Sequence, residues 1–172
     1  MTRSEPEHLV RAAAEIANDR EIVIVGSQSV LGQFPDAPSD LLVSAEADLY
    51  PRHFPERADL IDGSIGELSP FHQTFGYYAH GVGPETATLP SGWEDRLVQV
   101  PVGGVRGFCL EIHDLALSKW AGGREKDREF VESAVRHGLV HRRTLLARLA
   151  DMPLDAPRRT ALREVIEAVY RR

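Results

Sequence analysis

The sequence predicts an α+β fold with α/β character, in which a small mixed β-sheet is flanked by helices. A short β-branched run over 22–25 is typical of a strand that is buried on both faces. A hairpin pattern over 97–112 places two strand-like runs around the turn dipeptide Gly103-Gly104. The apolar spacing becomes helical after residue 112 and stays so to the end of the sequence. A chain whose strands come early and whose helices come late is predicted to form an α+β fold of this kind.

Each element follows from local spacing and from Gly, Pro, Asn and Asp signals at its ends. The elements expected before residue 93 are a helix over 5–18, a strand over 21–25, a short helix over 28–34, a loop over 35–39, a strand over 41–50, a helix over 55–68, a strand over 77–82 and a loop over 83–92. Those expected afterwards are hairpin strands over 97–102 and 105–112 and helices over 113–122, 125–137, 142–150 and 157–170.

The length of 172 residues is enough for one domain with a core of its own, alone or with a small helical appendage. We expect one domain over residues 1–138. The last helices are expected to form a C-terminal extension over 139–172 that packs on it.

Composition excludes several classes of protein. Apolar residues make up 42% and charged residues 27%, as in ordinary globular proteins. No apolar run approaches the roughly 18–20 residues that cross a bilayer, so no membrane partner is expected. The acidic start and the early helix argue against a secretory signal. The single Cys109 lies in an apolar run and is interpreted as a core residue, which fits a cytoplasmic protein.

Charge is distributed unevenly along the chain. Residues 1–100 contain 6 Arg and 16 acidic residues, whereas residues 101–172 contain 14 basic and 10 acidic residues, and the net charge is −6. An acidic half can bind cations, and a basic half can contact phosphate. The alternative is that the C-terminal helices simply carry more exposed Arg.

The turn Gly26-Ser27 is the first candidate for chemistry. An apolar strand leads into it, and a helix is expected directly after it. Backbone N–H groups and a hydroxyl in such a turn can bind phosphate oxygens, helped by the N-terminus of the helix. Most turns of this kind bind no phosphate, so the feature decides little by itself.

The second candidate is the pair Glu46 and Asp48 on the strand expected over 41–50. Residues two apart on a strand point to the same face, so the two carboxylates are expected side by side. Adjacent carboxylates repel each other unless they share a cation. Oxygen ligands of this kind suit Mg²⁺ or Mn²⁺, which also bind nucleotide phosphates. The alternative for the pair alone is a solvated strand face.

Together these features resemble the nucleotidyltransferase superfamily that shares its palm-like fold with DNA polymerase β. Its signature is an apolar strand, Gly-Ser or Gly-Gly, a helix, and an acid-x-acid pair on the next strand. The matching segments read Ile-Val-Ile-Val-Gly-Ser-Gln-Ser and Leu-Val-Ser-Ala-Glu-Ala-Asp-Leu. The resemblance implies a palm-like core within residues 1–138, an NTP triphosphate at Gly26 and Ser27, and Mg²⁺ or Mn²⁺ at Glu46 and Asp48.

The sequence departs from this signature in two ways. The first acid is Glu46 where the superfamily usually has Asp, which is expected to weaken metal binding without abolishing it. The spacing from Gly26 to the acids is longer than usual, and the loop over 35–39 accounts for the excess.

A later segment, Lys-Trp-Ala-Gly-Gly-Arg-Glu-Lys-Asp over 119–127, resembles a pattern of minimal nucleotidyltransferases that include the abortive-infection toxin branch. The resemblance implies catalytic roles for Lys119 and Asp127 and nucleotide contacts from Lys119, Arg124 and Lys126. An ammonium near a triphosphate offsets the charge that develops on the leaving pyrophosphate. The alternative is a set of exposed helix residues, with Asp127 capping the helix or pairing with Arg124 or Arg128.

The chain contains only two lysines, Lys119 and Lys126. Where Arg is the default cation, a retained Lys indicates a need for a compact ammonium. We expect Lys119 to be an exposed side chain that projects toward the Gly26-Ser27 turn.

The superfamily normally supplies a third carboxylate from a further strand, and the strand expected over 77–82 has none. Its central residue is His80, a possible base, although a structural histidine is the favoured interpretation. Glu94, Asp95 and Glu111 are alternative third acids, among which the sequence does not choose. Trp93 either stacks on a base or seals the core, and the core role is favoured.

These features predict a metal-dependent transferase that moves an NMP from an NTP to a hydroxyl acceptor. The acceptor is an RNA 3′ end such as that of a tRNA, a protein side chain or a small molecule. The basic C-terminal part and the toxin-like resemblance favour RNA, and the toxin-like resemblance adds a cognate antitoxin protein as a partner. The alternative is a catalytically weak relative that binds a nucleotide or a partner protein.

Overall fold

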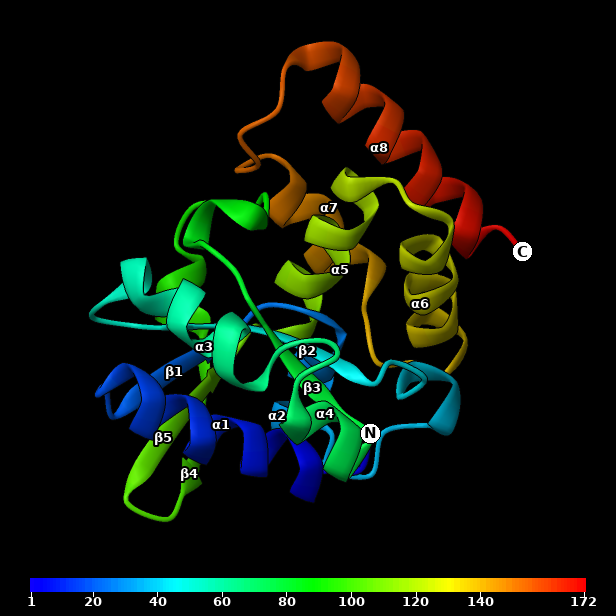
Figure 1. Cartoon of the computed structure of the whole chain (residues 1–172). Helices are drawn as coiled ribbons and strands as arrows, with labels where there is room; N and C mark the ends of the chain where they lie inside the picture. Colours follow the sequence, from blue (N-terminus) through cyan, green and yellow to red (C-terminus); the bar gives the residue numbers. More distant parts are fainter.

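The computed structural model describes residues 1–172, and it has one five-stranded mixed sheet with helices on both faces (Figure 1). The predicted α+β class and the mixed sheet flanked by helices are confirmed. None of the helices combines the length and the apolar character that a membrane span requires.

The strands follow the order β3-β2-β1-β5-β4 across the sheet. The central strand β1 (Glu21–Ile24) is antiparallel to β2 (Glu46–Pro51) and parallel to β5 (Val105–Cys109). At one edge β3 (Tyr78–Gly81) runs parallel to β2, and at the other β4 (Val98–Val102) forms the expected hairpin with β5. All four residues of β1 are buried, as its unbroken apolar run predicts.

Eight helices surround this sheet. Their bounds are α1 Ser4–Ala17, α2 Val30–Gln33, α3 Ala58–Ile65, α4 Pro70–Phe75, α5 Ile112–Gly122, α6 Glu125–Arg136, α7 Arg142–Leu149 and α8 Ala156–Tyr170. Short 3-10 turns occur at Ser27–Ser29, Ser39–Leu41, Pro55–Arg57, Pro84–Thr86 and Trp93–Arg96. The four helices expected after residue 112 are all present.

The two faces of the sheet have separate cores. On one face α1 and α3 pack against alternate strand residues such as Ile22, Ile24 and Leu49. On the other face Val23 and Phe108 pack with α2 and the four C-terminal helices. We call this second side the inner face, because the functional side chains described below lie on it.

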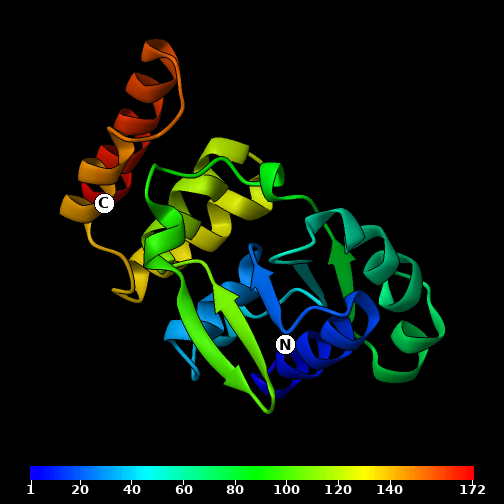
Figure 2. The same ribbon diagram turned by 90° about the vertical axis from the view of Figure 1, so that its left-hand side faces the viewer.

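The helices α7 and α8 stand at the end of the molecule farthest from α3 and α4 (Figure 2). Leu145, Leu149, Leu162 and Ile166 of these helices belong to the same buried cluster as the residues of α5 and α6. The proposed division at residue 138 stays a prediction.

The second strand is shorter than the prediction of 41–50. β1 pairs with residues 49–51 and β3 with residues 46–49, and the Ala45 carbonyl accepts from the Tyr78 N–H at 3.0 Å, so no neighbouring strand pairs with 41–44. Residues 39–41 form a 3-10 turn instead, and Val43 is 83% exposed. An alternating pattern does not form a strand where the sheet offers no partner.

The helix predicted over 55–68 was also too long. It begins as a 3-10 turn and ends at Ile65, and Gly66 and Leu68 lead into α4, a helix that the prediction missed. The Ser69 side chain accepts a hydrogen bond from the His72 N–H at 3.1 Å, and Pro70 is the first helical residue. This Ser-Pro start is a signal that the sequence contained.

The strand predicted over 105–112 ends at Cys109, and Ile112 begins α5. The Glu111 side chain caps that helix by accepting from the His113 N–H at 3.1 Å. Cys109 is buried as expected, and burial raises the pKa of its thiol to about 12.

Candidate functional site

A cleft of about 730 Å³ opens on the inner face, between β2, β3, α5 and α6. A hollow of about 230 Å³ shares Asp48, Lys119 and Arg124 with this cleft. All eight residues that the sequence singled out for metal or nucleotide binding and catalysis line one or both of these spaces. They are Gly26, Ser27, Glu46, Asp48, Lys119, Arg124, Lys126 and Asp127. The fold therefore brings the two sequence segments together, while their chemical roles stay predictions.

The acid pair lies on β2, where the side chains alternate between the two faces of the sheet. Ala47 and Leu49 enter the core under α1 and α3, so Glu46 and Asp48 face the cleft, as predicted. Both acid side chains are 29% exposed, which leaves them accessible from the cleft.

Gly26 lies tightly against this pair at the end of β1. The Val25 N–H donates to the Asp48 carbonyl oxygen at 3.0 Å, which extends the strand pairing to the edge of the turn. A methyl group at residue 26 would overlap the Asp48 carboxylate, although the backbone of Gly26 is extended with φ −91°. Space, rather than backbone conformation, therefore requires glycine here.

His80 of β3 completes the acidic group. β3 pairs with β2 so that His80 lies opposite Asp48. The His80 Nδ1 is 3.0 Å from Asp48 Oδ1 and 3.2 Å from Glu46 Oε1, and the side chain is 51% exposed. Tyr78, two residues earlier on the same strand, donates its hydroxyl to Glu46 Oε2 at 3.1 Å. The favoured interpretation of His80 as a structural residue did not anticipate this contact with both acids.

The acid pair is electrostatically strained. Burial raises the pKa of Asp48, and the hydrogen bond and the charge of Glu46 raise it further, to about 6. Burial also acts to raise the pKa of Glu46, but hydrogen bonds with Asp48 and Tyr78 outweigh it and lower that pKa. For His80, burial lowers the pKa, and the hydrogen bond and charge of Asp48 outweigh this and raise it. Asp48 therefore binds its proton more tightly than an ordinary aspartate does, because its carboxylate is partly buried and lies beside Glu46.

The opposite wall carries the basic residues, which belong to the junction of α5 and α6. Lys119 Nζ donates to Asp127 Oδ1 at 3.0 Å and lies 4.7 Å from the centre of the Phe130 ring. Arg124 Nε donates to Asp127 Oδ2 at 2.7 Å. The buried Asp127 therefore holds both Lys119 and Arg124 at the rim of the cleft. The alternative interpretation expected the pair between Asp127 and Arg124.

Lys119 is 11% exposed, so the expectation of an exposed lysine is wrong. Phe130 and Asp127 of α6 cover its side chain, and burial lowers the pKa of its ammonium, although Asp127 opposes the shift. Burial also acts to raise the pKa of Asp127, but its bonds with Arg124 and Lys119 outweigh that effect and lower it. The amine lines the same cleft as Ser27 and Asp48 rather than facing open solvent.

The helix α6 is attached to the cleft at both ends. Its first turn carries Lys126 and Asp127. Near its last turn Ser133 donates its hydroxyl to Asp40, and Arg136 pairs with the same carboxylate at 3.3 Å. Asp40 belongs to the segment that leads into β2, so α6 connects the basic wall to the approach of the acidic strand.

The Gly26-Ser27 turn leads into one 3-10 turn and the four-residue α2, so the helix dipole expected to support phosphate binding is small. Ser29 donates its hydroxyl to the Ile24 carbonyl at 2.6 Å and thereby fixes the turn to β1. The Ser27 side chain makes no hydrogen bond within the protein and lines the cleft. Its hydroxyl is therefore available to a ligand.

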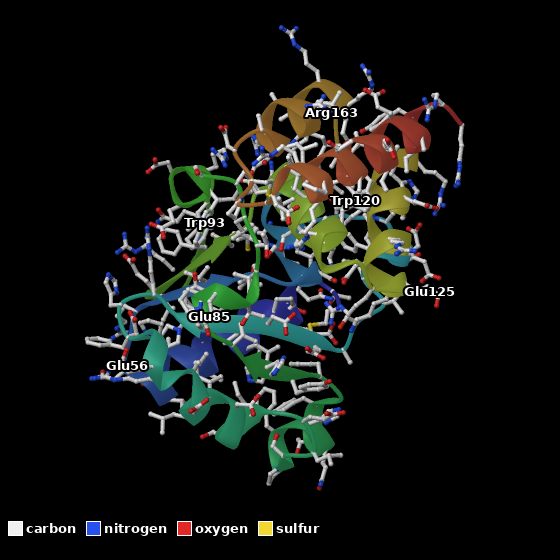
Figure 3. All side chains as sticks on the ribbon, turned by 90° about the horizontal axis from the view of Figure 1, so that it is seen from above. Glu56, Glu85, Trp93, Trp120, Glu125 and Arg163 are labelled. Carbon is white, nitrogen blue, oxygen red and sulfur yellow. The ribbon has the colours of Figure 1, made fainter.

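None of the three alternative third acids lines the cleft. Glu111 pairs with His113 and Arg148, which overcome the effect of burial and lower its pKa to about 2. Glu94 and Asp95 are exposed in the turn Trp93–Arg96. Trp93 is half-buried against the inner core, as its favoured interpretation predicts, and lies across the molecule from Glu125 at the start of α6 (Figure 3).

The comparisons with known proteins agree with this geometry. Residues 7–156 match the family described as "nucleotidyltransferase of unknown function (DUF6036)". The match begins in α1 and ends at the start of α8, so it includes the whole sheet, the acid pair and the α5–α6 junction. No curated protein and no solved structure matches the chain. Because the match covers most of its length, the chain belongs to this family of nucleotidyltransferases.

Proposed function

We propose that the protein transfers an NMP from an NTP to a hydroxyl acceptor with the help of Mg²⁺ or Mn²⁺. One observation carries the proposal: a single cleft has Glu46 and Asp48 on one wall and, on the other, Lys119, Arg124 and Lys126 together with Glu129 and Glu132 of α6. A nucleoside triphosphate with a divalent ion is a ligand that complements both walls.

The residues present fit a divalent ion. Glu46 and Asp48 offer carboxylate oxygens, the donors that Mg²⁺ and Mn²⁺ prefer. Burial, followed by the hydrogen bond and the charge of Glu46, raises the pKa of Asp48 to about 6, and a cation shared by the two carboxylates would offset these effects. When bound, such an ion supplies charge neutralisation on the phosphates and activation of the reacting oxygens.

The basic wall supplies phosphate contacts. Lys119 offers a point charge at the rim of a partly buried cleft, where electrostatic stabilisation is larger than in water. Arg124, which is 65% exposed, can turn toward a ligand without leaving Asp127 uncompensated, because Lys119 stays paired with that carboxylate. Ser27 adds a free hydroxyl. Asp127 acts as the residue that positions Lys119 and Arg124.

In the proposed reaction the acceptor oxygen attacks the α-phosphorus in line with the leaving group. The new bond joins the acceptor oxygen to the α-phosphorus, the bond to the β-phosphate oxygen breaks, and pyrophosphate leaves. The acceptor proton passes to a base. Lys119 and Arg124 offset the negative charge that collects on the departing pyrophosphate.

The acceptor and the biological role are finer parts of the proposal. The basic C-terminal part supports an RNA 3′ end, such as that of a tRNA, over a protein side chain or a small molecule. A toxin-like role with a cognate antitoxin protein rests on the sequence resemblance over 119–127. The second candidate function is a catalytically weak nucleotide-binding or partner-binding relative, favoured by Glu46 in place of Asp and by the lack of a third carboxylate beside Glu46 and Asp48.

The first part of the test measures nucleotide and metal binding, and the second part measures nucleotide transfer. Thermal unfolding is measured with each of the four NTPs, with and without Mg²⁺ or Mn²⁺, because a ligand of the native state raises the midpoint. The purified protein is then incubated with α-³²P-labelled NTPs and cellular RNA. Label on RNA that disappears in the Asp48→Asn variant supports the transferase, whereas a midpoint shift without label supports the binder. A midpoint that no combination moves contradicts both functions.

A further inference from the structure

We infer that His80 is a ligand of the divalent ion, bound through its imidazole nitrogen Nδ1, and that the site therefore prefers Mn²⁺ to Mg²⁺. This inference rests on the proposed function, since it concerns the ion that Glu46 and Asp48 would hold. It goes beyond that function by naming a ligand that is not a carboxylate and the class of ion that such a ligand favours.

The spacing of the three side chains is the first observation. Glu46, Asp48 and His80 form the only group of three or more His, Cys, Asp or Glu residues whose ligand atoms all lie within 4.8 Å of one another. The His80 Nδ1 is 3.0 Å and 3.2 Å from the nearest oxygens of the two acids. Two neighbouring ligands at about 2.1 Å from an octahedral ion are about 3.0 Å apart. The nitrogen therefore already has the spacing of an adjacent ligand to each carboxylate.

The sheet holds this arrangement in place. His80 and Asp48 are opposite each other on paired strands, so their separation is set by backbone hydrogen bonds rather than by a loop. The Tyr78 hydroxyl binds the other oxygen of Glu46, Oε2, and leaves Oε1 directed at His80. This is the usual way in which an outer hydrogen bond orients a metal-binding carboxylate.

His80 lies on β3, the strand from which the superfamily resemblance would lead one to expect a third carboxylate. The half-exposed imidazole occupies that place in the cleft, and no other acid of the chain joins the group. We therefore assign to His80 the third ligand position, with nitrogen in place of oxygen.

The donor set decides the class of ion. Mg²⁺ binds oxygen ligands and gives up its water reluctantly, whereas imidazole nitrogen suits transition ions such as Fe²⁺, Ni²⁺ and Zn²⁺, and Mn²⁺, the first of that series, shares the carboxylate preference of Mg²⁺ but also accepts nitrogen. Affinity for a given site rises from Mn²⁺ toward Cu²⁺, so Mn²⁺ is the weakest-binding ion of this class and Co²⁺ and Zn²⁺ should bind more tightly still. A site of two carboxylates and one imidazole therefore discriminates against Mg²⁺.

The experiment measures metal binding directly on the full-length protein at pH 7.5, with a non-hydrolysable ATP analogue present throughout. Isothermal titration calorimetry gives the affinities for Mn²⁺ and Mg²⁺, and pulsed EPR of bound Mn²⁺ reports any coupled imidazole nitrogen. The variants are His80→Gln, His80→Asp and Asp48→Asn. The matched control is His53→Gln, which removes an imidazole that contacts a carboxylate, Asp19 at 2.9 Å, outside the cleft.

We expect the wild type to bind Mn²⁺ at least about 10-fold more tightly than Mg²⁺ and to show nitrogen coupling. His80→Gln should weaken Mn²⁺ binding by about 10-fold or more and remove the coupling, while His53→Gln changes neither. His80→Asp should restore binding but shift the preference toward Mg²⁺. This reversal distinguishes a ligand from a histidine that only supports the fold.

Two results would overturn the inference, and they separate it from the proposed function. If Asp48→Asn abolishes Mn²⁺ binding but His80→Gln leaves affinity and spectrum unchanged, His80 is not a ligand and the transferase site stands without it. If no ion binds the wild type, the inference and the metal-dependent function both fail.

Discussion

Two clusters of this protein each combine a pair of carboxylates with a histidine, and they are neutralised in different ways. At the start of α5, Glu111 and Asp114 share Arg148, and Asp114 also binds Arg96 through two hydrogen bonds. On β2 and β3, Glu46 and Asp48 contact only His80 and the Tyr78 hydroxyl.

The consequence is visible in their ionisation. The contacts of His113 and Arg148 lower the pKa of Glu111 to about 2, whereas burial and Glu46 raise the pKa of Asp48 to about 6. Direct pairing with guanidinium groups completes the first cluster within the fold. The second cluster lacks such a partner and faces a cleft. This difference separates a cluster whose charges are paired within the fold from one that matches the pattern of a functional site.

The largest expected effect is on catalysis, at the cluster of Glu46, Asp48 and His80. Asp48→Asn should lower transferase activity by about 10³-fold or more, because it removes a metal ligand worth several kcal/mol in the transition state. Circular dichroism should show an unchanged fold. An unfolded variant would mean that Asp48 is a structural carboxylate like Asp114. The proposed difference between the two clusters would then be wrong.

The next effect is on stability at the structural cluster. Asp114→Asn should lower the free energy of unfolding by about 3 kcal/mol, because Asp114 is fully buried and its loss leaves Arg96 without its carboxylate partner and Arg148 with Glu111 alone. Urea denaturation measures the change. A loss below about 1 kcal/mol would show that the arginines find other partners and that the cluster is not needed for the fold.

Substitution of Lys119 is expected to affect both activity and stability. Lys119→Ala should remove nearly all activity and also destabilise the protein by about 2–3 kcal/mol, since Asp127 is left buried with one partner fewer. Lys119→Arg should keep most of the stability and still lose much of the activity, because a planar guanidinium does not replace a compact ammonium. Steady-state kinetics and urea denaturation separate the two. Equal activity in wild type and Lys119→Arg would rule out a point-charge role.

The smallest effect is the pH dependence of stability without metal, which has opposite signs in the two clusters. Glu111 has a lowered pKa, so its contribution is complete above the unfolded value of 4.5 and is lost as pH falls toward about 2. Asp48 has a raised pKa, so its contribution is complete below 3.8 and is lost as pH rises through about 6. Asp48→Asn should therefore stabilise the metal-free protein by about 1–2 kcal/mol at pH 8 and have little effect at pH 3.5. Urea denaturation at both pH values tests this sign.

Much of the fold followed from local patterns. The apolar run of β1, the Gly103-Gly104 hairpin and the four helices after residue 112 carry their signals in consecutive residues. Prediction was wrong where an element depends on a distant partner. Residues 41–44 alternate like a strand but have no neighbour in the sheet.

The candidate site divides in the same way. Alternation on β2 was enough to predict that Glu46 and Asp48 share a face. The contact of His80 with both acids depends on the register between β2 and β3, which no local pattern specifies. The burial of Lys119 depends on how α6 folds back over α5, so an expectation drawn from one helix could not include it.

The two attachments of α6 determine how precisely one wall of the cleft is held in position. One 12-residue helix carries Lys126 and Asp127 in its first turn and the contacts to Asp40 near its other end, so a single rigid element sets the opening between the acidic and basic walls. Over a length of about 18 Å, a tilt of only a few degrees displaces the cations by about 1 Å, enough to change a reaction rate about 100-fold. The distant Asp40 contacts thus set how precisely this wall of the cleft is positioned.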